Sequence, residues 1–240
     1  MMENLATTLG RVFNEAISPM GPPTVEQLNL INQNRPLGRE PYTAEEIVSV
    51  PIIASNNLVN WSNGRWNRDA LIKMAETYPG QPFAVDHPMY TVKDTVGFIY
   101  DAQLIESNAA PESILEAAGE LVNNTAVVKA EGFIQMVCYA AIAAGHPILD
   151  SIDMGRINNA STGCITDGTS LCPLDGTEFG SQSRYRCAEG HYHPFYAWWY
   201  DVEDEDLIAP YAIKTGVISS IELSLVFMGN LPAASIPRGA

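Results

Sequence analysis

Residues 217–227, VISSIELSLVF, form the most strand-like stretch of the chain. β-Branched and long aliphatic side chains dominate it, and a single carboxylate stands in its middle. Because successive side chains of a strand point to opposite faces, alternation predicts one polar and one apolar face. The polar face would carry Ser220, Glu222 and Ser224, and the apolar face Ile221, Leu223 and Leu225. Glu222 then either lies on a solvated face or orients a histidine from another strand.

Other short strands precede this one, together with a few helices. We expect strands over residues 46–60, 82–87, 95–105, 125–134 and 196–200, and helices over residues 68–78, 111–121 and 135–145. Pro51 marks the first strand as an edge strand or a bulged one, and Asn67 is a suitable N-cap for the first helix. Strands and helices do not alternate as they do in βαβ units. The pattern predicts an α+β, mainly β fold: an antiparallel, partly closed β-barrel flanked by helices.

Two segments depart from this pattern. Repeated prolines in residues 1–45 predict a loosely organised N-terminal arm, which leaves residues 46–240 as the folded domain. Within that domain, residues 164–195 are short of aliphatic side chains and rich in Gly, Ser, Cys and His. We therefore expect a Cys/His-rich subdomain inserted at about 164–195.

Composition narrows the class of protein. Of the 240 residues, 46% are hydrophobic, which is enough to build a core. Acidic residues outnumber basic ones 28 to 13, and a formal net charge of −15 disfavours a general nucleic-acid binder, because phosphate contacts need Lys and Arg. No apolar run approaches the roughly 20 residues of a membrane helix. The N-terminus lacks a signal-peptide pattern, so we expect a reducing compartment in which cysteines are thiols or metal ligands.

Two further residues could take part in nucleophilic chemistry with Glu222. His87 ends the apolar run PFAVDH, and histidine is suited to accept and return a proton near neutral pH. Ser161 lies in NASTG at residues 159–163, which predicts a turn that exposes its hydroxyl beside backbone N–H groups. Both residues also have simpler interpretations: a structural histidine at a strand end and a turn-forming serine.

Three blocks together resemble the tailed-phage prohead (capsid maturation) serine protease family, whose fold is similar to that of the herpesvirus assemblin proteases. They are LIKMAETYPGQPFAVDHPMYTVKDTVGF at residues 71–98, ASTG at residues 160–163 and IELSLVFMGNLPAASI at residues 221–236. The resemblance covers roughly residues 46–163 and 210–236. The chain departs from the family in the long connection between Ser161 and Glu222, which holds the Cys/His-rich segment, and in Thr162 directly after the serine.

The resemblance implies roles for particular residues. His87 would be the general base, Ser161 the nucleophile and Glu222 the acidic third member, with the backbone N–H groups of Thr162 and Gly163 as oxyanion donors. The chain would then be a serine endopeptidase that needs no catalytic cofactor. An order of His, Ser and Glu along the chain does not prove such a triad, because only geometry does.

The family also implies a setting and partners. The substrates would be the major capsid protein and the scaffold protein, cut inside the viral procapsid in the host cytoplasm, and a homo-oligomer is compatible with this. Neither nucleic acid nor a membrane is expected as a partner. The alternative is a catalytically inactive, protease-like head or scaffold component with a zinc-stapled interaction insert.

The inserted segment offers metal ligands of its own. Zinc takes about four N or S ligands in a tetrahedral array. The candidates are Cys164, Cys172, Cys187 and either His191 or His193. Their spacing is not a pair of Cys-x2-Cys knuckles, so reduced thiols with surface histidines, or a disulfide, stay open as alternatives. A structural zinc ion would explain how a segment with so few aliphatic side chains is ordered.

Overall fold

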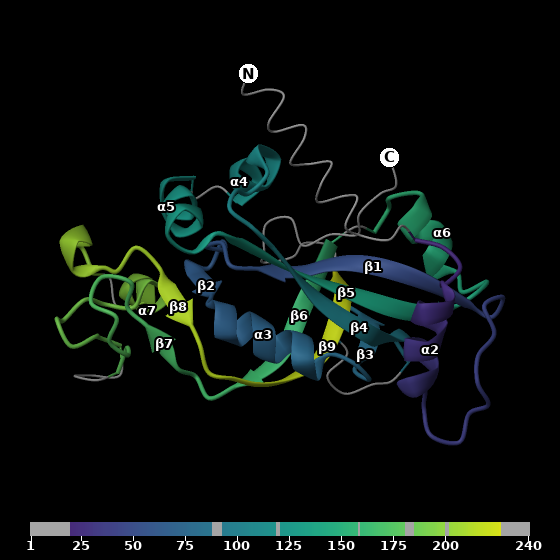
Figure 1. Ribbon diagram of the computed structural model, residues 1–240. Helices are drawn as coiled ribbons and strands as arrows, with labels where there is room; N and C mark the ends of the chain where they lie inside the picture. The colour runs from purple at the N-terminus through teal and green to yellow at the C-terminus, as the bar shows by residue number, and fades with distance from the viewer. Residues whose placement is uncertain are drawn as a thin grey trace.

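The computed structural model describes residues 20–87, 93–118, 121–157, 159–180, 185–199 and 202–226. Its main feature is a six-stranded sheet, strongly curled into a half-barrel, with the strand order β1-β5-β4-β3-β9-β6 (Figure 1). The strands are β1 (Ile47–Asn56), β3 (Pro82–Val85), β4 (Thr95–Ser107), β5 (Phe133–Ala143), β6 (Asn159–Thr166) and β9 (Val217–Val226). Neighbouring strands are antiparallel except for the parallel pair β3–β9. The expected α+β, partly closed barrel flanked by helices is confirmed.

The concave side of this sheet holds the main core. Buried side chains from all six strands meet there, among them Ile52, Ile99 and Leu223. Helix α3 (Arg68–Thr77) contributes Leu71 and Met74 to the same cluster. As expected, the Asn67 side chain caps α3 by accepting a hydrogen bond of 2.9 Å from the backbone N–H of Ala70. Helix α3 therefore fills the half-barrel from within and packs against β9.

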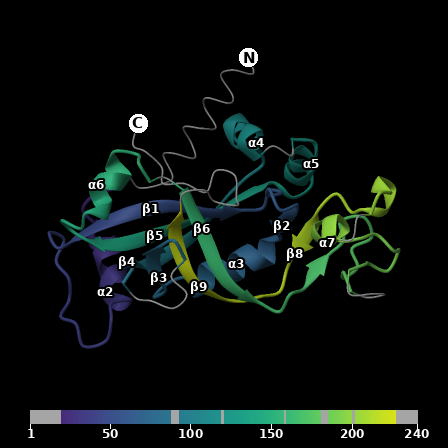
Figure 2. The ribbon, with the colours of Figure 1, turned by 180° about the vertical axis from the view of Figure 1, so that it is seen from behind.

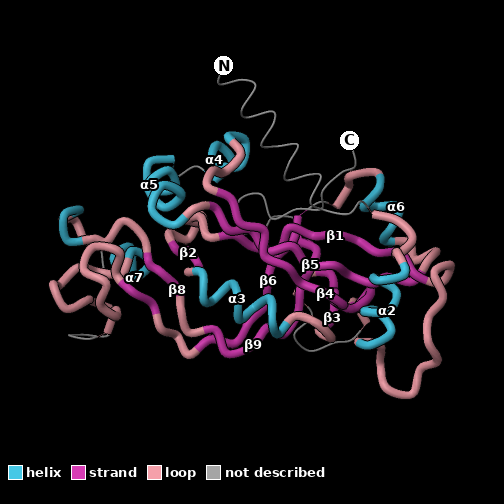
Figure 3. The backbone as a smooth tube through the Cα atoms, in the orientation of Figure 1, coloured by secondary structure: helices cyan, strands magenta, loops and turns pink. Residues whose placement is uncertain are grey.

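The remaining helices cover the ends and the outer face. Helices α2 (Val25–Gln33) and α6 (Ile148–Asp153) lie at one end of the sheet, and α4 (Glu112–Ala118) and α5 (Leu121–Glu131) lie together near the other (Figure 3). Ile31 of α2 packs on the outer face of the sheet with Tyr100 and Val137. The segment expected to be a loose arm therefore contains a docked helix, while residues 1–19 lie outside the described residues. None of the described helices is long and apolar enough to cross a membrane.

A small lobe stands at the end of the sheet opposite α2 (Figure 2). It contains a three-stranded sheet of β2 (Gly64–Trp66), β8 (Ala212–Lys214) and β7 (Ser170–Leu171), with α7 (Pro194–Trp199) and the 3-10 helix η1 (Glu205–Leu207). The lobe has its own small cluster of buried side chains: Cys172, Phe179, Cys187, Ala209 and Ala212. The Cys/His-rich segment thus shares a lobe with β2 and β8, and among the described residues the buried cluster of this lobe holds two cysteines and one large side chain, Phe179.

Three element predictions are wrong. The strand expected over 125–134 is mostly helix α5, the helix expected over 135–145 is mostly strand β5, and the aromatic segment 196–200 falls largely in helix α7. Strand β5 lies second in the sheet and is buried on both faces up to Ile142, so its apolar residues do not alternate with polar ones. The β-branched residues of α5 suggested a strand, but tertiary packing overrides such local preferences. Part of that packing is Asn124, whose Oδ1 accepts a hydrogen bond of 2.6 Å from the backbone N–H of Val59.

The alternation predicted for β9 holds only in its second half. A bulge in the β6–β9 pairing places Gly163 opposite Glu222 and Cys164 opposite Ser220, leaving Ile221 as the extra residue. Ile221 is consequently exposed, while Ser220 is buried and donates a hydrogen bond of 3.1 Å to the backbone carbonyl of Met74 in α3. The predicted polar face is therefore reduced to Glu222 and Ser224.

Candidate active site and metal centre

Glu222 and His87 form a direct pair. Glu222 Oε1 lies 2.7 Å from His87 Nδ1, and the glutamate side chain is largely buried, at 16% exposed, against 38% for the histidine. A carboxylate beside Nδ1 accepts a hydrogen bond from the Nδ1–H and leaves Nε2 as the basic nitrogen of a neutral imidazole. The arrangement suits a histidine that takes up a proton at Nε2.

The backbone around His87 is unusual. Asp86 and His87 have φ values of 55° and 49°, in the left-handed region that non-glycine residues rarely adopt. They directly follow β3, and two contacts tie them to β9. The Asp86 N–H donates to the carbonyl of Leu225 over 3.0 Å, and the His87 N–H donates to Ser224 Oγ over 3.2 Å. Strain of this kind persists where surrounding contacts hold it, and it is common at functional sites.

Ser224 fixes the glutamate as well as the histidine. Its hydroxyl donates a short hydrogen bond to Glu222 Oε2 and at the same time accepts the His87 N–H. The side chain is fully buried on β9. Ser224 therefore links both members of the pair without being exposed to a substrate.

Gly163 makes room for the carboxylate. It lies opposite Glu222 in the β6–β9 pair, and a Cβ at position 163 would sit 2.1 Å from Glu222 Oε1. Any other residue at position 163 would push Glu222 away from its place beside His87.

Ser161 lies on the strand next to this pair. It is the cross-strand partner of Ser224, and such partners have Cα atoms about 4.5–5.5 Å apart with side chains on the same face. Within the described part of the chain, Ser161 Oγ makes no hydrogen bond to His87 or to another residue. The three residues are thus gathered on neighbouring elements, while the serine–histidine contact itself is not formed.

The expected nucleophile turn is corrected. Residues 159–163 belong to strand β6, where they pair with β9 up to the bulge. Ala160 lies opposite Leu225 and packs in the main core. Strand β6 is the last strand of the sheet, so half of its backbone N–H groups point away from β9. Oxyanion donors from Thr162 or Gly163 would have to come from that outward row rather than from a glycine turn.

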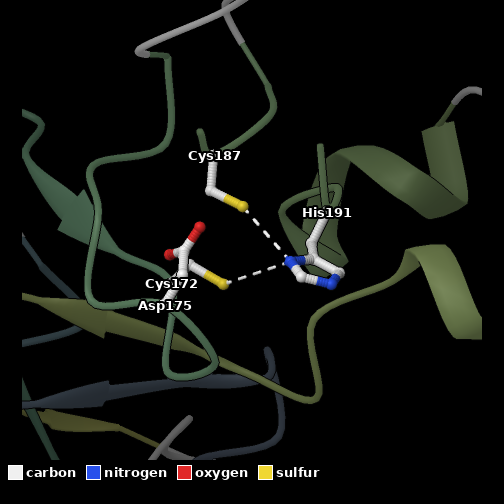
Figure 4. Close-up of side chains that lie close together, drawn as sticks. All are labelled: Cys172, Asp175, Cys187 and His191. Carbon is white, nitrogen blue, oxygen red and sulfur yellow. Dashed lines mark hydrogen bonds between the residues drawn. The ribbon is translucent and has the colours of Figure 1, made fainter. Parts of the chain in front are cut away.

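A second group of side chains lies in the small lobe. Cys172, Asp175, Cys187 and His191 each offer one ligand atom, and the four atoms lie within 4.8 Å of one another (Figure 4). His191 Nδ1 lies 3.3 Å from Cys187 Sγ and 4.0 Å from Cys172 Sγ. A tetrahedral zinc site with bonds of about 2.0–2.3 Å has ligand–ligand distances of about 3.3–3.8 Å. The donor types and spacing fit, so this group could hold a metal ion such as zinc.

The local structure explains the position of Asp175. Its Oδ1 accepts hydrogen bonds of 2.9 Å from the N–H and the hydroxyl of Thr177, and its Oδ2 accepts one of 3.2 Å from the N–H of Glu189. The Thr177 N–H and these other donors hold the pKa of the Asp175 carboxyl well below its usual range. Burial instead raises the pKa of the Cys172 thiol to about 11, a cost that a bound cation would offset.

Two expected metal ligands lie elsewhere. Cys164 sits on β6 with its side chain packed at the edge of the main core. The His193 ring contacts the rings of Phe179 and Tyr196, and burial lowers its pKa to about 4. Cys164 pairs with β9, and the His193 ring contacts aromatic rings, so among the described residues the group that could hold a metal is corrected to Cys172, Cys187 and His191 with Asp175.

Sequence reasoning missed several of these roles. Asp175 precedes Gly176 in a Pro-Leu-Asp-Gly turn, and its spacing of three from Cys172 was an available signal. Strand alternation predicts the correct face for Ser224, but its hydrogen bond to His87 depends on the parallel β3–β9 pairing.

A comparison with protein-family models found no match, and no curated protein or solved structure matches the chain.

Proposed function

We propose that the chain is a serine endopeptidase of the prohead-protease type. The nucleophile is Ser161, the general base is His87, and Glu222 orients the base. The observation that carries the proposal is the 2.7 Å contact between Glu222 Oε1 and His87 Nδ1, beside the strand that bears Ser161. A carboxylate on one imidazole nitrogen and a hydroxyl on the adjacent strand are the parts that acyl transfer requires.

The reaction follows the order of these groups. His87 Nε2 accepts the proton of Ser161 Oγ as the oxygen attacks the scissile peptide carbonyl. The outward N–H row of β6 donates to the resulting oxyanion. His87 then gives its proton to the leaving amine, and water, deprotonated by the same nitrogen, hydrolyses the acyl-enzyme. Glu222 stabilises the imidazolium in both steps.

The contact between Ser161 Oγ and His87 has to form when substrate binds. Catalytic hydrogen bonds are often long in unliganded enzymes and tighten in the complex. Strand β9 lies between β3, which leads to His87, and β6, which carries Ser161, so the two side chains have to reach toward each other across β9. If Ser161 Oγ and the His87 ring never come into contact, the chain is the alternative: an inactive head or scaffold component.

The substrates follow from the family resemblance. We propose the major capsid protein and the scaffold protein, cut within the procapsid in the host cytoplasm, with a homo-oligomer as the working form. The test is co-expression of the chain with the capsid and scaffold proteins of the same phage, followed by intact mass measurement of each product. Wild type should shorten at least one of them, and Ser161→Ala should leave all of them intact.

The control is Ser170→Ala, which removes a serine of β7 in the small lobe. It should cut as wild type does. Full-length capsid and scaffold proteins in assembled procapsids with wild type would favour the inactive structural component. Equal cutting by Ser161→Ala would assign the activity to another nucleophile.

For the small lobe we propose a structural zinc ion held by Cys172, Cys187 and His191, with Asp175 as the fourth ligand. Two observations support it: the fit of the donor set, and the small buried cluster of a lobe that includes both cysteines. A structural metal commonly replaces a core in segments of this size. The ion would hold the lobe together and would not enter the peptide-bond chemistry.

A further inference from the structure

A small cavity opens where the two edge strands of the half-barrel, β1 and β6, approach each other. Its volume is about 130 Å³, and two alanines and six larger residues line it. The larger residues are Ser55, Asn60, Trp66, Ser161, Thr162 and Lys214. The cavity thus lies beside the proposed nucleophile, but it is built from residues outside the Glu222–His87 pair.

Lys214 is the one charged residue among the described residues that line this cavity. Its Nζ lies 5.2 Å from the centroid of the Trp66 ring, and a Cβ at Gly64 would come within 2.6 Å of its Cε, so glycine makes room for its stem. Burial lowers the pKa of the Lys214 ammonium. Although acidic residues outnumber basic ones in this chain, no carboxylate of the described residues lies within ion-pair distance of Lys214.

Two other polar side chains of the wall, Ser55 and Asn60, can donate a hydrogen bond to a ligand. The Ser55 hydroxyl is buried and has no hydrogen-bond partner in the described structure. Asn60 Oδ1 already accepts the Ser62 N–H, the Ser62 hydroxyl and the Gly64 N–H, which leaves the Asn60 amide N–H groups as donors. A buried hydroxyl without a partner is costly, and a largely buried ammonium gains from a nearby negative charge, so one anionic acceptor would stabilise both.

We propose that this cavity binds a carboxylate group, held by the Lys214 ammonium and the Ser55 hydroxyl. The volume is suited to a carboxylate with a short aliphatic stem, and the wall offers that stem the Trp66 ring and two alanines. The carboxylate comes either from an acidic side chain of a bound peptide or from a free small acid. Only the peptide source rests on the proposed protease function, because Ser161 lines the same cavity.

The test is a titration of the full chain with acetate, observed through the backbone amide resonances of Ser161, Thr162 and Lys214. Acetamide, which has the same shape without the charge, is the matched ligand. Acetate should move these resonances in a saturable way and acetamide should not. Lys214→Met should weaken acetate binding by about tenfold or more, because a charge-assisted hydrogen bond is lost.

Ser55→Ala gives a second, smaller change that does not disturb an existing hydrogen bond, and it should weaken acetate binding severalfold. Lys73→Met removes an exposed lysine on α3 and should bind acetate as wild type does. Acetate binding is measured without any peptide substrate, so this result is independent of catalysis. The proposal is overturned if acetate does not move the three resonances, or if Lys214→Met and Ser55→Ala both bind it like wild type.

A peptide pair separates the two sources. Acetyl-Ala-Ala-Glu-Ala-Ala-amide and its Gln counterpart differ only in the carboxylate. Tighter binding of the Glu peptide by about tenfold, lost in Lys214→Met, assigns the cavity to an acidic side chain of a peptide. Equal binding of the two peptides, together with saturable acetate binding, assigns it to a free carboxylate.

Discussion

Gly163 and Glu222 face each other across the β6–β9 pair so closely that a Cβ on Gly163 would sit 2.1 Å from Glu222 Oε1. The same oxygen lies 2.7 Å from His87 Nδ1. The position of the glutamate beside the histidine therefore depends on the absence of a side chain one strand away.

Gly163→Ala should displace Glu222 and leave His87 without its orienting carboxylate. We expect a loss of cleavage rate of about 100-fold, as misplacing a catalytic group by about 1 Å can cause. The measurement is the rate of capsid or scaffold cleavage. Gly21→Ala is the matched control, because nothing lies within 4 Å of a Cβ at position 21. If Gly163→Ala cleaves as fast as Gly21→Ala, Glu222 does not need to be held beside His87 for cleavage.

Ser224→Ala should weaken the site without touching the nucleophile. It removes a hydroxyl that donates to Glu222 and accepts from the His87 backbone. We expect the cleavage rate to fall by about tenfold, with substrate KM nearly unchanged, since Ser224 is buried and holds a charged partner. Ser224→Thr, which keeps the hydroxyl, should recover part of the rate. A purely structural serine would lower the melting temperature without this recovery.

Zinc should be found with the purified chain at about one ion per molecule. Cys172→Ser should lose the ion, and chelation of the wild type should lower the melting temperature by about 5 °C or more. Cys164→Ser is the matched control, because Cys164 lies on β6 outside the cluster, and it should keep its zinc. Protein purified without chelator that contains no zinc would contradict the structural role.

Gly97→Ala should destabilise the sheet itself. A Cβ at position 97 would lie 2.2 Å from the backbone oxygen of Ala141 in the neighbouring strand, and backbone cannot move aside as a flexible side chain can. We expect a loss of about 1–3 kcal/mol in the free energy of unfolding. Denaturant unfolding beside Gly21→Ala provides the measurement, and equal midpoints for the two variants would refute the close packing of β4 on β5.

Lys214→Met should stabilise the ligand-free fold at neutral pH. Burial lowers the pKa of Lys214, so the folded state binds this proton less tightly than the unfolded chain does. Above the unfolded pKa the residue is neutral in both states and costs no stability. As the pH falls from there through the folded pKa, the lysine becomes a buried ammonium, and the free energy of unfolding decreases. We expect the melting temperature at pH 7 to rise by about 2–4 °C. A fall comparable to that of a core deletion would indicate an acidic partner for Lys214.

The pattern of the sequence predicts those parts of the fold that rest on local physics. Asn67 caps α3 as its side chain and position require, and Leu223 and Leu225 face the core as strand alternation demands. The same kind of reasoning predicts the partly closed barrel and three members of the metal-binding group, Cys172, Cys187 and His191, but not Asp175. The pairing of Glu222 with a histidine was one of two open interpretations, and strand pairing brings the two residues together.

Other features depend on tertiary contacts that no local pattern carries. Strand β5 is buried on both faces, so its alanines do not alternate with polar residues and the segment resembles an apolar helix. The bulge at Ile221 reverses the face of Ser220, and it arises only because β6 and β9 pair with unequal numbers of residues. The place of Lys214 beside Ser55 and Ser161 also depends on tertiary contacts, because β8 belongs to the small lobe whereas the two serines belong to β1 and β6.

The most direct test of the central claim is covalent labelling of the purified chain with a fluorophosphonate, read by intact and peptide mass. Acyl-transfer chemistry at Ser161 predicts a single adduct on that residue, absent in Ser161→Ala and formed much more slowly in His87→Ala, while Ser170→Ala labels like wild type. An unlabelled wild type, or an adduct on another residue, would contradict the assignment of Ser161 as a nucleophile activated by the Glu222–His87 pair.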